Sequence, residues 1–90
     1  MNIDSKFLIP PQVIARKIGD ETVILALESG TYFGLDPVGA RMWHLMEAGK
    51  SLAQVCDTMI EEYEVERDVL QRDLLSLVGE LVEKKLVDVG

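Results

Sequence analysis

The chain has little of the chemistry that enzymes use. Its 90 residues include one cysteine, Cys56, and one histidine, His44. A single cysteine cannot form an internal disulfide, which predicts a reducing compartment, most simply the cytoplasm. The sequence contains no Cys/His cluster with metal-ligand spacing and no glycine-rich phosphate-binding loop. It therefore predicts no catalytic residue, no metal site and no cofactor, and an enzyme is the least favoured class.

Positive charge and long apolar runs are also scarce. Nine Lys and Arg residues oppose 16 Asp and Glu residues, so the net charge is −7. Residues 57–90 hold ten acidic and four basic residues, or −6 of that charge. Nucleic-acid binding needs cations against phosphate, and anionic membranes attract basic surfaces. No run is long enough to span a bilayer, and no signal peptide is recognisable. The sequence thus argues against nucleic acids and membranes as partners.

The chain does have enough apolar sequence for one small folded unit. Hydrophobic residues make up 48% of it, which argues against disorder. We expect residues 1–12 to form an irregular lead-in, because Pro10-Pro11 favours an extended backbone. Residues 13–90 are expected to form a single domain.

Three strands are predicted in the first half of the chain. Apolar and β-branched residues fill three short stretches, and turn residues separate them at Gly19-Asp20 and Ser29-Gly30. The stretches are residues 13–18, 22–27 and 31–35. Short turns join neighbouring strands into an antiparallel meander, in which the first and third strands are both edges. An open edge is a place where another chain can bind.

Helices are predicted to follow the third strand directly. Asp36 suits the N-cap and Pro37 the first position of a helix that ends near Ala48. Ser51 and Gln54 form a capping-box pattern at the start of a second helix with a regular apolar stripe. The expected fold class is therefore α+β, a three-stranded meander followed by three helices.

The third helix is expected to start after Asp68, with Gln71 in the matching capping-box position, and to run to about Lys85. It has an unusually wide apolar surface. Its leucines and valines fall on two neighbouring lines, Leu70, Leu74, Leu77 and Leu81 on one and Leu75, Val78 and Val82 on the other. Together they exceed the stripe of roughly 100° that is typical of a surface helix. One line can pack on the other helices, while the second is left for the sheet, a second subunit or a ligand.

The order of these motifs resembles the PqqD-like family, which includes the small proteins of pyrroloquinoline quinone biosynthesis and their relatives. The resemblance begins with Leu35-Asp36-Pro37-Val38-Gly39-Ala40 and Met42-Trp43. It continues with the step Gly49-Lys50-Ser51 into the second helix, the apolar helix of residues 55–63, and the ending of residues 81–87. These motifs cover nearly the whole chain.

The resemblance implies a winged helix-turn-helix-like fold and a function without catalysis. Such proteins are peptide chaperones that bind the leader of a ribosomally made precursor peptide and present it to a modifying enzyme, often a radical SAM enzyme. In the family the leader adds as a strand to the third strand and lies against the third helix. Carried over to this sequence, the expected contacts are Thr31, Tyr32, Phe33, Gly34 and Leu35 on the strand and Val69, Leu70, Asp73, Leu74 and Leu77 on the helix.

Three of these residues permit more specific expectations. Tyr32 and Phe33 point to opposite faces of their strand, so only one of them can line a groove beside the helix. Gly34 either lets a partner backbone approach closely or marks a bulge before the helix. Asp73 can pair with a Lys or Arg of the leader, which would guide encounter more than it adds affinity.

Two other functions stay open at this point. One is a small adaptor or structural subunit that forms a homodimer through the extra apolar face of the third helix. Strand exchange between copies is another route to a dimer. The other function is a winged-helix transcription regulator, which the acidic helical half disfavours because a recognition helix needs basic residues.

Overall fold

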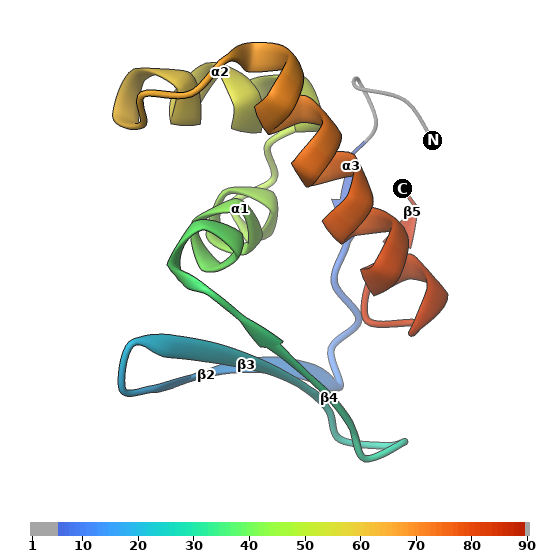
Figure 1. The fold of residues 1–90 in the computed structure, drawn as a ribbon. Coiled ribbons are helices and arrows are strands. Elements are labelled where there is room, and N and C mark those ends of the chain that lie inside the picture. Colours follow the sequence, from blue (N-terminus) through green and yellow to red (C-terminus); the bar gives the residue numbers. More distant parts are fainter. Residues whose placement is uncertain (1–5, 90) are drawn as a thin grey trace.

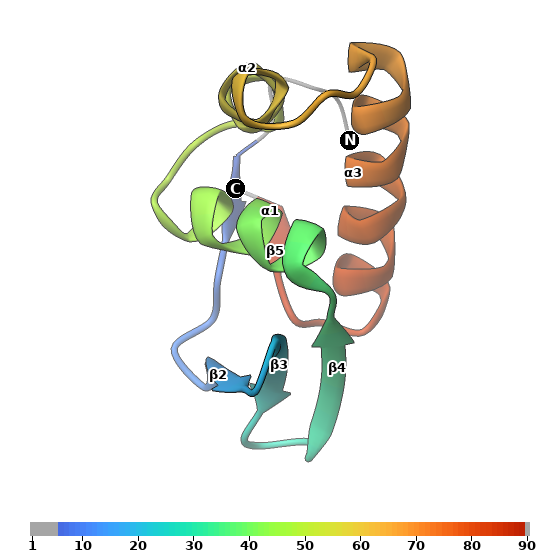
Figure 2. The ribbon, with the colours of Figure 1, turned by 60° about the vertical axis from the view of Figure 1, so that its left-hand side comes forward.

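The fold places a three-stranded sheet on one side and three helices on the other (Figures 1 and 2). The computed structural model describes residues 6–89. Its elements, in chain order, are β1 (Phe7–Leu8), β2 (Val13–Ile18), β3 (Glu21–Ala26), β4 (Thr31–Leu35), α1 (Pro37–Glu47), α2 (Leu52–Glu62), α3 (Arg67–Glu83) and β5 (Asp88–Val89). The predicted α+β class, with a meander followed by three helices, is confirmed.

The sheet has the order β2-β3-β4, and both pairs of strands are antiparallel. The predicted edge positions of the first and third strands are therefore confirmed. β3 begins at Glu21 and ends at Ala26, one residue earlier at each end than expected. Leu27 follows the strand instead of belonging to it, and 63% of its surface is exposed.

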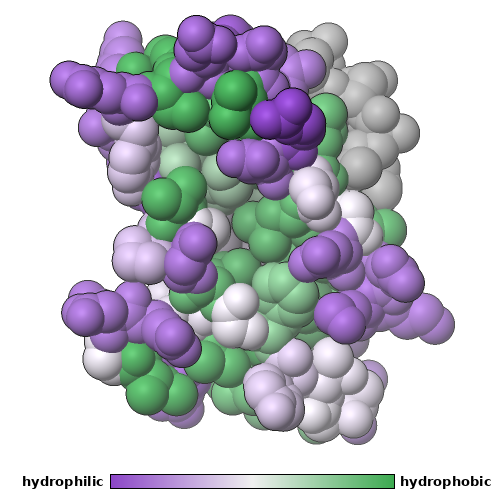
Figure 3. Space-filling model, viewed as in Figure 1, coloured by the Kyte–Doolittle hydropathy of each residue, from purple (hydrophilic) through white to green (hydrophobic). Residues whose placement is uncertain are grey.

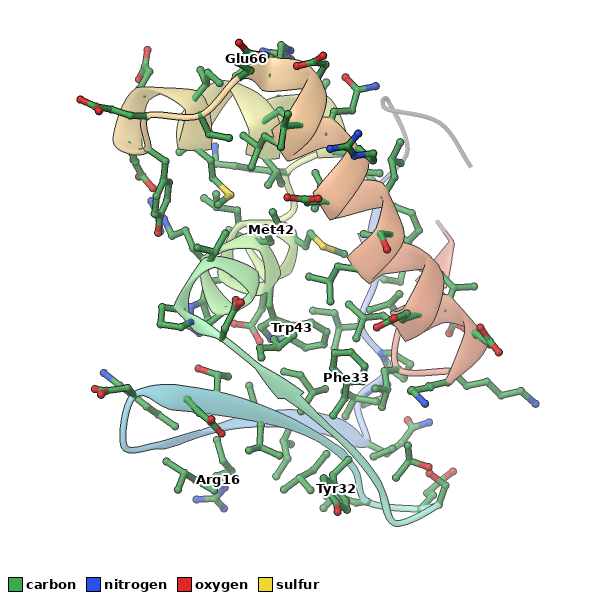
Figure 4. The ribbon with its side chains drawn as sticks, in the orientation of Figure 1. Arg16, Tyr32, Phe33, Met42, Trp43 and Glu66 are labelled. Atoms are coloured by element: carbon green, nitrogen blue, oxygen red, sulfur yellow. The ribbon has the colours of Figure 1, made fainter. Side chains whose placement is uncertain are left out.

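The helices cover one face of this sheet and leave the other bare (Figure 2). Ile24 in the central strand is fully buried, and Val13, Ala26 and Leu35 from the same face join the core. Trp43 of α1 lies over this face and is also fully buried (Figure 4). The inner face of the sheet is thus part of the hydrophobic core.

Local side-chain caps fix where the first two helices begin. The Asp36 carboxylate accepts a hydrogen bond of 2.8 Å from the Gly39 amide at the start of α1. At the start of α2, the Ser51 hydroxyl accepts from the Gln54 amide, and the Gln54 side chain accepts from the Ser51 amide. Both predicted caps are confirmed, and each satisfies backbone donors that the first helical turn leaves free.

The start of α3 differs from the prediction. The helix begins at Arg67, the N-cap is Glu66, and the cap side chain makes no hydrogen bond. Asp68 lies inside the first turn, so the expected capping box with Gln71 is wrong. The Asp68 carboxylate accepts a hydrogen bond of 2.9 Å from the neighbouring Val69 amide instead of capping the helix at Gln71. The Arg67 guanidinium donates to the Asp57 carboxylate over 2.6 Å, which joins the first residue of α3 to α2.

The expected irregular lead-in contains a short strand. Phe7 and Leu8 form β1, which pairs with β5 at the other end of the chain. Phe7 is buried in the core, and so are Leu86 and Val87 just before β5. Residues 1–5 of the expected lead-in lie outside the described residues. A two-residue strand whose partner is so distant in sequence leaves no local pattern that could predict it.

The wide apolar surface of α3 mostly faces the core. Leu70, Leu74, Val78 and Leu81 are buried, whereas Leu77 is half-buried. The buried side of α3 therefore draws on both predicted lines, and it packs on α1 and α2.

The single cysteine and the single histidine of the chain lie in different surroundings. Cys56 is buried in α2, and this burial raises the pKa of its thiol above the ordinary value. His44 is exposed on α1. Within residues 6–89, no helix is long and apolar enough to cross a membrane.

Candidate functional site

The free edge of β4 is the first component of the site. Among residues 6–89, β4 pairs with β3 on one side only, and α3 lies beyond its other side (Figures 1 and 2). The strand contains no charged side chain, since its residues are Thr31-Tyr32-Phe33-Gly34-Leu35. An uncharged open edge offers its backbone groups to another strand.

The hydrogen-bond pattern shows which backbone groups of β4 are available. The Leu27 amide donates to the Gln12 carbonyl over 2.9 Å, so alternate residues of β3 counted from Leu27 face β2. The others, including Ile24, face β4, where Ile24 is paired with Phe33. Phe33 therefore bonds to β3.

It follows that Tyr32 and Gly34 direct their N–H and C=O groups to the open edge, because backbone groups alternate between the two sides of a strand. These groups are spaced as a ladder that an added strand can complete, whether it runs parallel or antiparallel. The edge thus has a defined set of donors and acceptors.

The two aromatic side chains of β4 point to opposite faces, as expected. Phe33 is half-buried and points to the helices, toward Trp43, whereas Tyr32 points away from them (Figure 4). Tyr32 is 73% exposed. Phe33 is therefore the aromatic residue that lines the space between the sheet and α3.

A cavity of about 280 Å³ lies between β4, the start of α1 and α3. Its walls are Phe33, Gly34 and Leu35 from β4, Asp36, Val38, Gly39 and Met42 from the α1 region, and Asp73 and Leu77 from α3. Hydrophobic side chains are exposed between the helices and the sheet on this face (Figure 3). We call this cavity and the β4 edge beside it the edge groove.

The structure brings together five of the residues that the sequence predicted for binding. Phe33, Gly34, Leu35, Asp73 and Leu77 all line the edge groove. The open edge therefore lies beside an apolar wall that carries one carboxylate, at Asp73.

The other predicted residues occupy different places. Leu70 and Leu74 are buried, at 3% and 0% exposure, so they hold α3 in the core instead of presenting a surface. Val69 is half-buried outside the cavity lining. Thr31 lies at the far end of β4, beside a second cavity that includes Lys84 of the turn after α3.

Sequence reasoning missed the contribution of α1. Val38 and Met42 line the edge groove because residues four apart lie on one face of a helix. Gly39 lies between them, and a Cβ there would be 3.3 Å from the Asp36 carboxylate and 3.4 Å from a Leu35 methyl. That spacing was visible in the sequence, but the side of α1 that faces the groove was not.

Gly34 does not form a bulge. The register between β3 and β4 runs without interruption through Val23 and Gly34. Its φ lies outside the left-handed region, and a Cβ at this position would meet nothing within 4 Å. Of the two explanations that the sequence left open, the bulge is therefore wrong.

The edge groove offers a mainly apolar surface for binding. Within residues 6–89, no group of three His, Cys, Asp or Glu side chains could hold a metal ion. The ion pairs of this part of the chain, Arg41 with Glu62 and Arg67 with Asp57, join helices and leave Asp73 available to a ligand. The arrangement suits an extended peptide that adds to β4 and places apolar side chains against Phe33 and Leu77.

Comparisons with known proteins identify a family and two similar solved structures. A family model described as coenzyme PQQ synthesis protein D (PqqD) matches residues 21–87. No curated protein matches the chain. The solved structure "TbiB1 in Complex with the TbiA(beta) Leader Peptide" is similar, with 42% identity and a TM-score of 0.82 over 89% of this chain and 93% of that chain. So is "Lasso peptide synthetase B1 complexed with the leader peptide", with 30% identity and a TM-score of 0.83 over 91% and 96% of the two chains.

Proposed function

The chain belongs to the PqqD family, and from this premise we propose that it is a non-catalytic peptide chaperone. It binds the leader of a ribosomally made precursor peptide at the edge groove and presents the precursor to a modifying enzyme. Because the precursor is made by ribosomes, this encounter takes place in the cytoplasm. The free edge of β4 is the observation that carries the proposal.

The geometry of the edge groove supports strand addition. The backbone groups of Tyr32 and Gly34 face outward, so a peptide gains main-chain hydrogen bonds without any special side chain. Alternate peptide residues then point toward Phe33 and Leu77, where apolar pockets can select among side chains. Main-chain bonds give affinity and the groove gives specificity.

The two similar structures support a leader peptide as the ligand, since each of them holds one. They also guide the choice of enzyme. The family resemblance implies a radical SAM enzyme, whereas one of the two similar proteins is part of a lasso peptide synthetase. We propose a lasso-type precursor as the first to test and a radical SAM substrate as the second.

Amide hydrogen exchange tests the proposal residue by residue. The probe is the TbiA(beta) leader peptide, which the more identical of these two structures contains. We expect the amides of Tyr32 and Gly34 to exchange more slowly once the peptide is bound, because they gain hydrogen bonds. The amides of Phe33 and Leu35 already bond within the sheet and are expected to change less.

The opposite edge of the sheet provides the control. The amides of Ala15 and Lys17 face outward from β2 and are expected to exchange at the same rate with and without peptide. Saturating peptide that leaves Tyr32 and Gly34 unprotected would contradict strand addition at β4. Protection at Ala15 and Lys17 instead would move the site to β2.

A further inference from the structure

The face of the sheet that no helix covers carries apolar side chains. Arg16 and Tyr32 both point away from the helices (Figure 4). The register places Ile14, Leu25 and Tyr32 in one row of this outer face, and Arg16, Val23 and Gly34 in the next. Antiparallel sheets usually turn polar side chains to water, so a row of Ile, Leu and Tyr there needs an explanation.

Gly34 leaves a gap at the border of this face. A glycine inside a strand loses conformational entropy on folding and has no side chain to pack. Nothing in the described part of the chain requires a glycine here, since the register is regular, φ is outside the left-handed region and a Cβ would meet nothing within 4 Å. The gap lies beside Val23 and next to the open edge.

A strand added to β4 would place side chains on this outer face as well as in the edge groove. Residues level with Phe33 point to the groove, and residues level with Tyr32 and Gly34 point outward, because neighbouring strands share their faces. This holds for either strand direction. A peptide residue level with Gly34 lies two strand spacings, about 9.6 Å, from Val23.

We propose that the bound peptide carries an aromatic residue level with Gly34, whose ring lies across the glycine on the outer face of the sheet, between Tyr32 and Val23. This inference rests on the proposed strand addition. Only an unbranched or aromatic side chain can span the gap to Val23, and an aromatic ring also reaches Tyr32 on the diagonal. Aromatic residues that cover a neighbouring glycine are a known device for stabilising sheets.

The size of the outer face favours a peptide over a second copy of the chain. Three strands of about six residues present a face of roughly 280 Å², given spacings of about 4.8 Å between strands and 3.3 Å along them. A stable protein interface buries about 800 Å² on each partner. The outer face by itself is therefore well short of such an interface, while a single ring needs only the gap at Gly34.

Gly34→Val tests the proposal by filling the gap. Valine favours strands and points into open space here, so the free protein is expected to keep or gain thermal stability. We expect calorimetry to show at least 10-fold weaker binding of the TbiA(beta) leader peptide. Gly34→Ala fills less of the gap and is expected to cost less. Arg16→Val, which puts valine in the same row on the opposite edge, is the matched control and is expected to bind like wild type.

Peptides in which each aromatic residue is changed to alanine identify the ring. One of these alanine peptides is expected to bind wild type at least 10-fold more weakly than the unchanged leader does. Gly34→Val is expected not to weaken the binding of this peptide further, since both changes remove the same contact. Equal binding of the leader to Gly34→Val and wild type would overturn the inference, as would additive losses for every aromatic residue. In either case, protection of Tyr32 and Gly34 in wild type would leave strand addition intact, whereas no binding to wild type would overturn both.

Discussion

The two edges of the same small sheet differ in almost every property that governs strand addition. β2 carries Arg16 and Lys17 in adjacent positions, and the Val13 amide already donates to the Pro10 carbonyl over 2.9 Å. β4 carries no charge, and Gly34 removes a side chain from its path. Charged side chains on an edge strand prevent unwanted pairing. One edge is thus protected, and the other is open beside an apolar groove.

Whether an edge strand can accept another strand therefore depends on its surroundings as much as on its own sequence. Both strands expose alternate backbone groups, those of Ala15 and Lys17 on β2 and those of Tyr32 and Gly34 on β4. Only β4 has α3 beyond it, with Leu77 and Asp73 in the wall of the cavity. A strand added there buries side chains as well as pairing its backbone.

Proline substitution on each edge gives the largest expected effect. Tyr32→Pro removes an amide that faces outward, so no bond within the sheet is lost. We expect it to weaken binding of the leader peptide at least 100-fold, because a main-chain bond is lost and the proline ring blocks the approaching strand. Calorimetry measures the affinity, and thermal unfolding shows that the fold is retained.

Two controls separate the backbone from the side chain and one edge from the other. Tyr32→Ala removes the ring but keeps the amide, so it is expected to weaken binding much less than proline. Lys17→Pro removes an outward amide from β2 and is expected to leave the affinity unchanged. Equal losses for Tyr32→Pro and Lys17→Pro would show that the two edges do not differ in function.

The sequence predicts a structural feature when the residues that determine this feature lie close together along the chain. Asp36 and Ser51 cap their helices through neighbours three residues away, so a local pattern predicts them. The start of α3, in contrast, lies where Arg67 contacts Asp57, a residue of α2 that the fold brings to it across a turn. Local patterns succeed where the partner is local.

The site shows the same limit. Leu74 and Leu77 share one line of the predicted helix, yet the first is fully buried and the second lines the edge groove, because α1 and α2 pack on one side of α3. Likewise, the outward direction of the Gly34 backbone follows from the hydrogen bond between Leu27 and Gln12 and from the strand registers that lead from it to β4. Such features depend on how separate elements meet, and the sequence does not encode that locally.

Removing the charges from β2 is expected to have an intermediate effect and to make the edges more alike. Arg16→Thr combined with Lys17→Val leaves an uncharged β-branched strand, which favours pairing between copies. We expect the average mass in sedimentation equilibrium to rise with concentration for this variant and to stay constant for Arg16→Lys combined with Lys17→Arg, which keeps both charges. A monomeric double variant would contradict the view that these charges protect the edge.

The charge near each edge is expected to affect peptide binding less than the substitutions described above. Asp73 lies in the wall of the edge groove, whereas β2 is basic, so a leader with Lys or Arg is drawn toward β4. We expect Asp73→Asn to slow association of such a peptide by a few-fold at low salt and to have no effect at high salt, since exposed pairs contribute about 1 kcal/mol or less. Stopped-flow measurements at two salt concentrations test this. Glu21→Gln, at the start of β3 and outside the lining of the edge groove, is the matched control and is expected to change neither rate.

The smallest expected effect is that of acid on the contact between α1 and α2, which lies away from both edges of the sheet. Arg41 donates two hydrogen bonds, of 2.9 and 2.6 Å, to the carboxylate of Glu62 and so joins α1 to α2. These bonds hold the pKa of Glu62 below its ordinary value. A carboxyl whose pKa is lower in the folded state stabilises the fold above its unfolded pKa of about 4.3 and loses that contribution as the pH falls through the folded value. We expect the melting temperature of wild type to be slightly above that of Glu62→Gln at pH 7, and this difference to disappear as the pH falls below 4.

Neither Arg41 nor Glu62 lines the edge groove, so the leader is expected to bind Glu62→Gln and wild type equally at pH 7. A difference in melting temperature that persists to pH 3 would show that Glu62 does not titrate as the structure indicates.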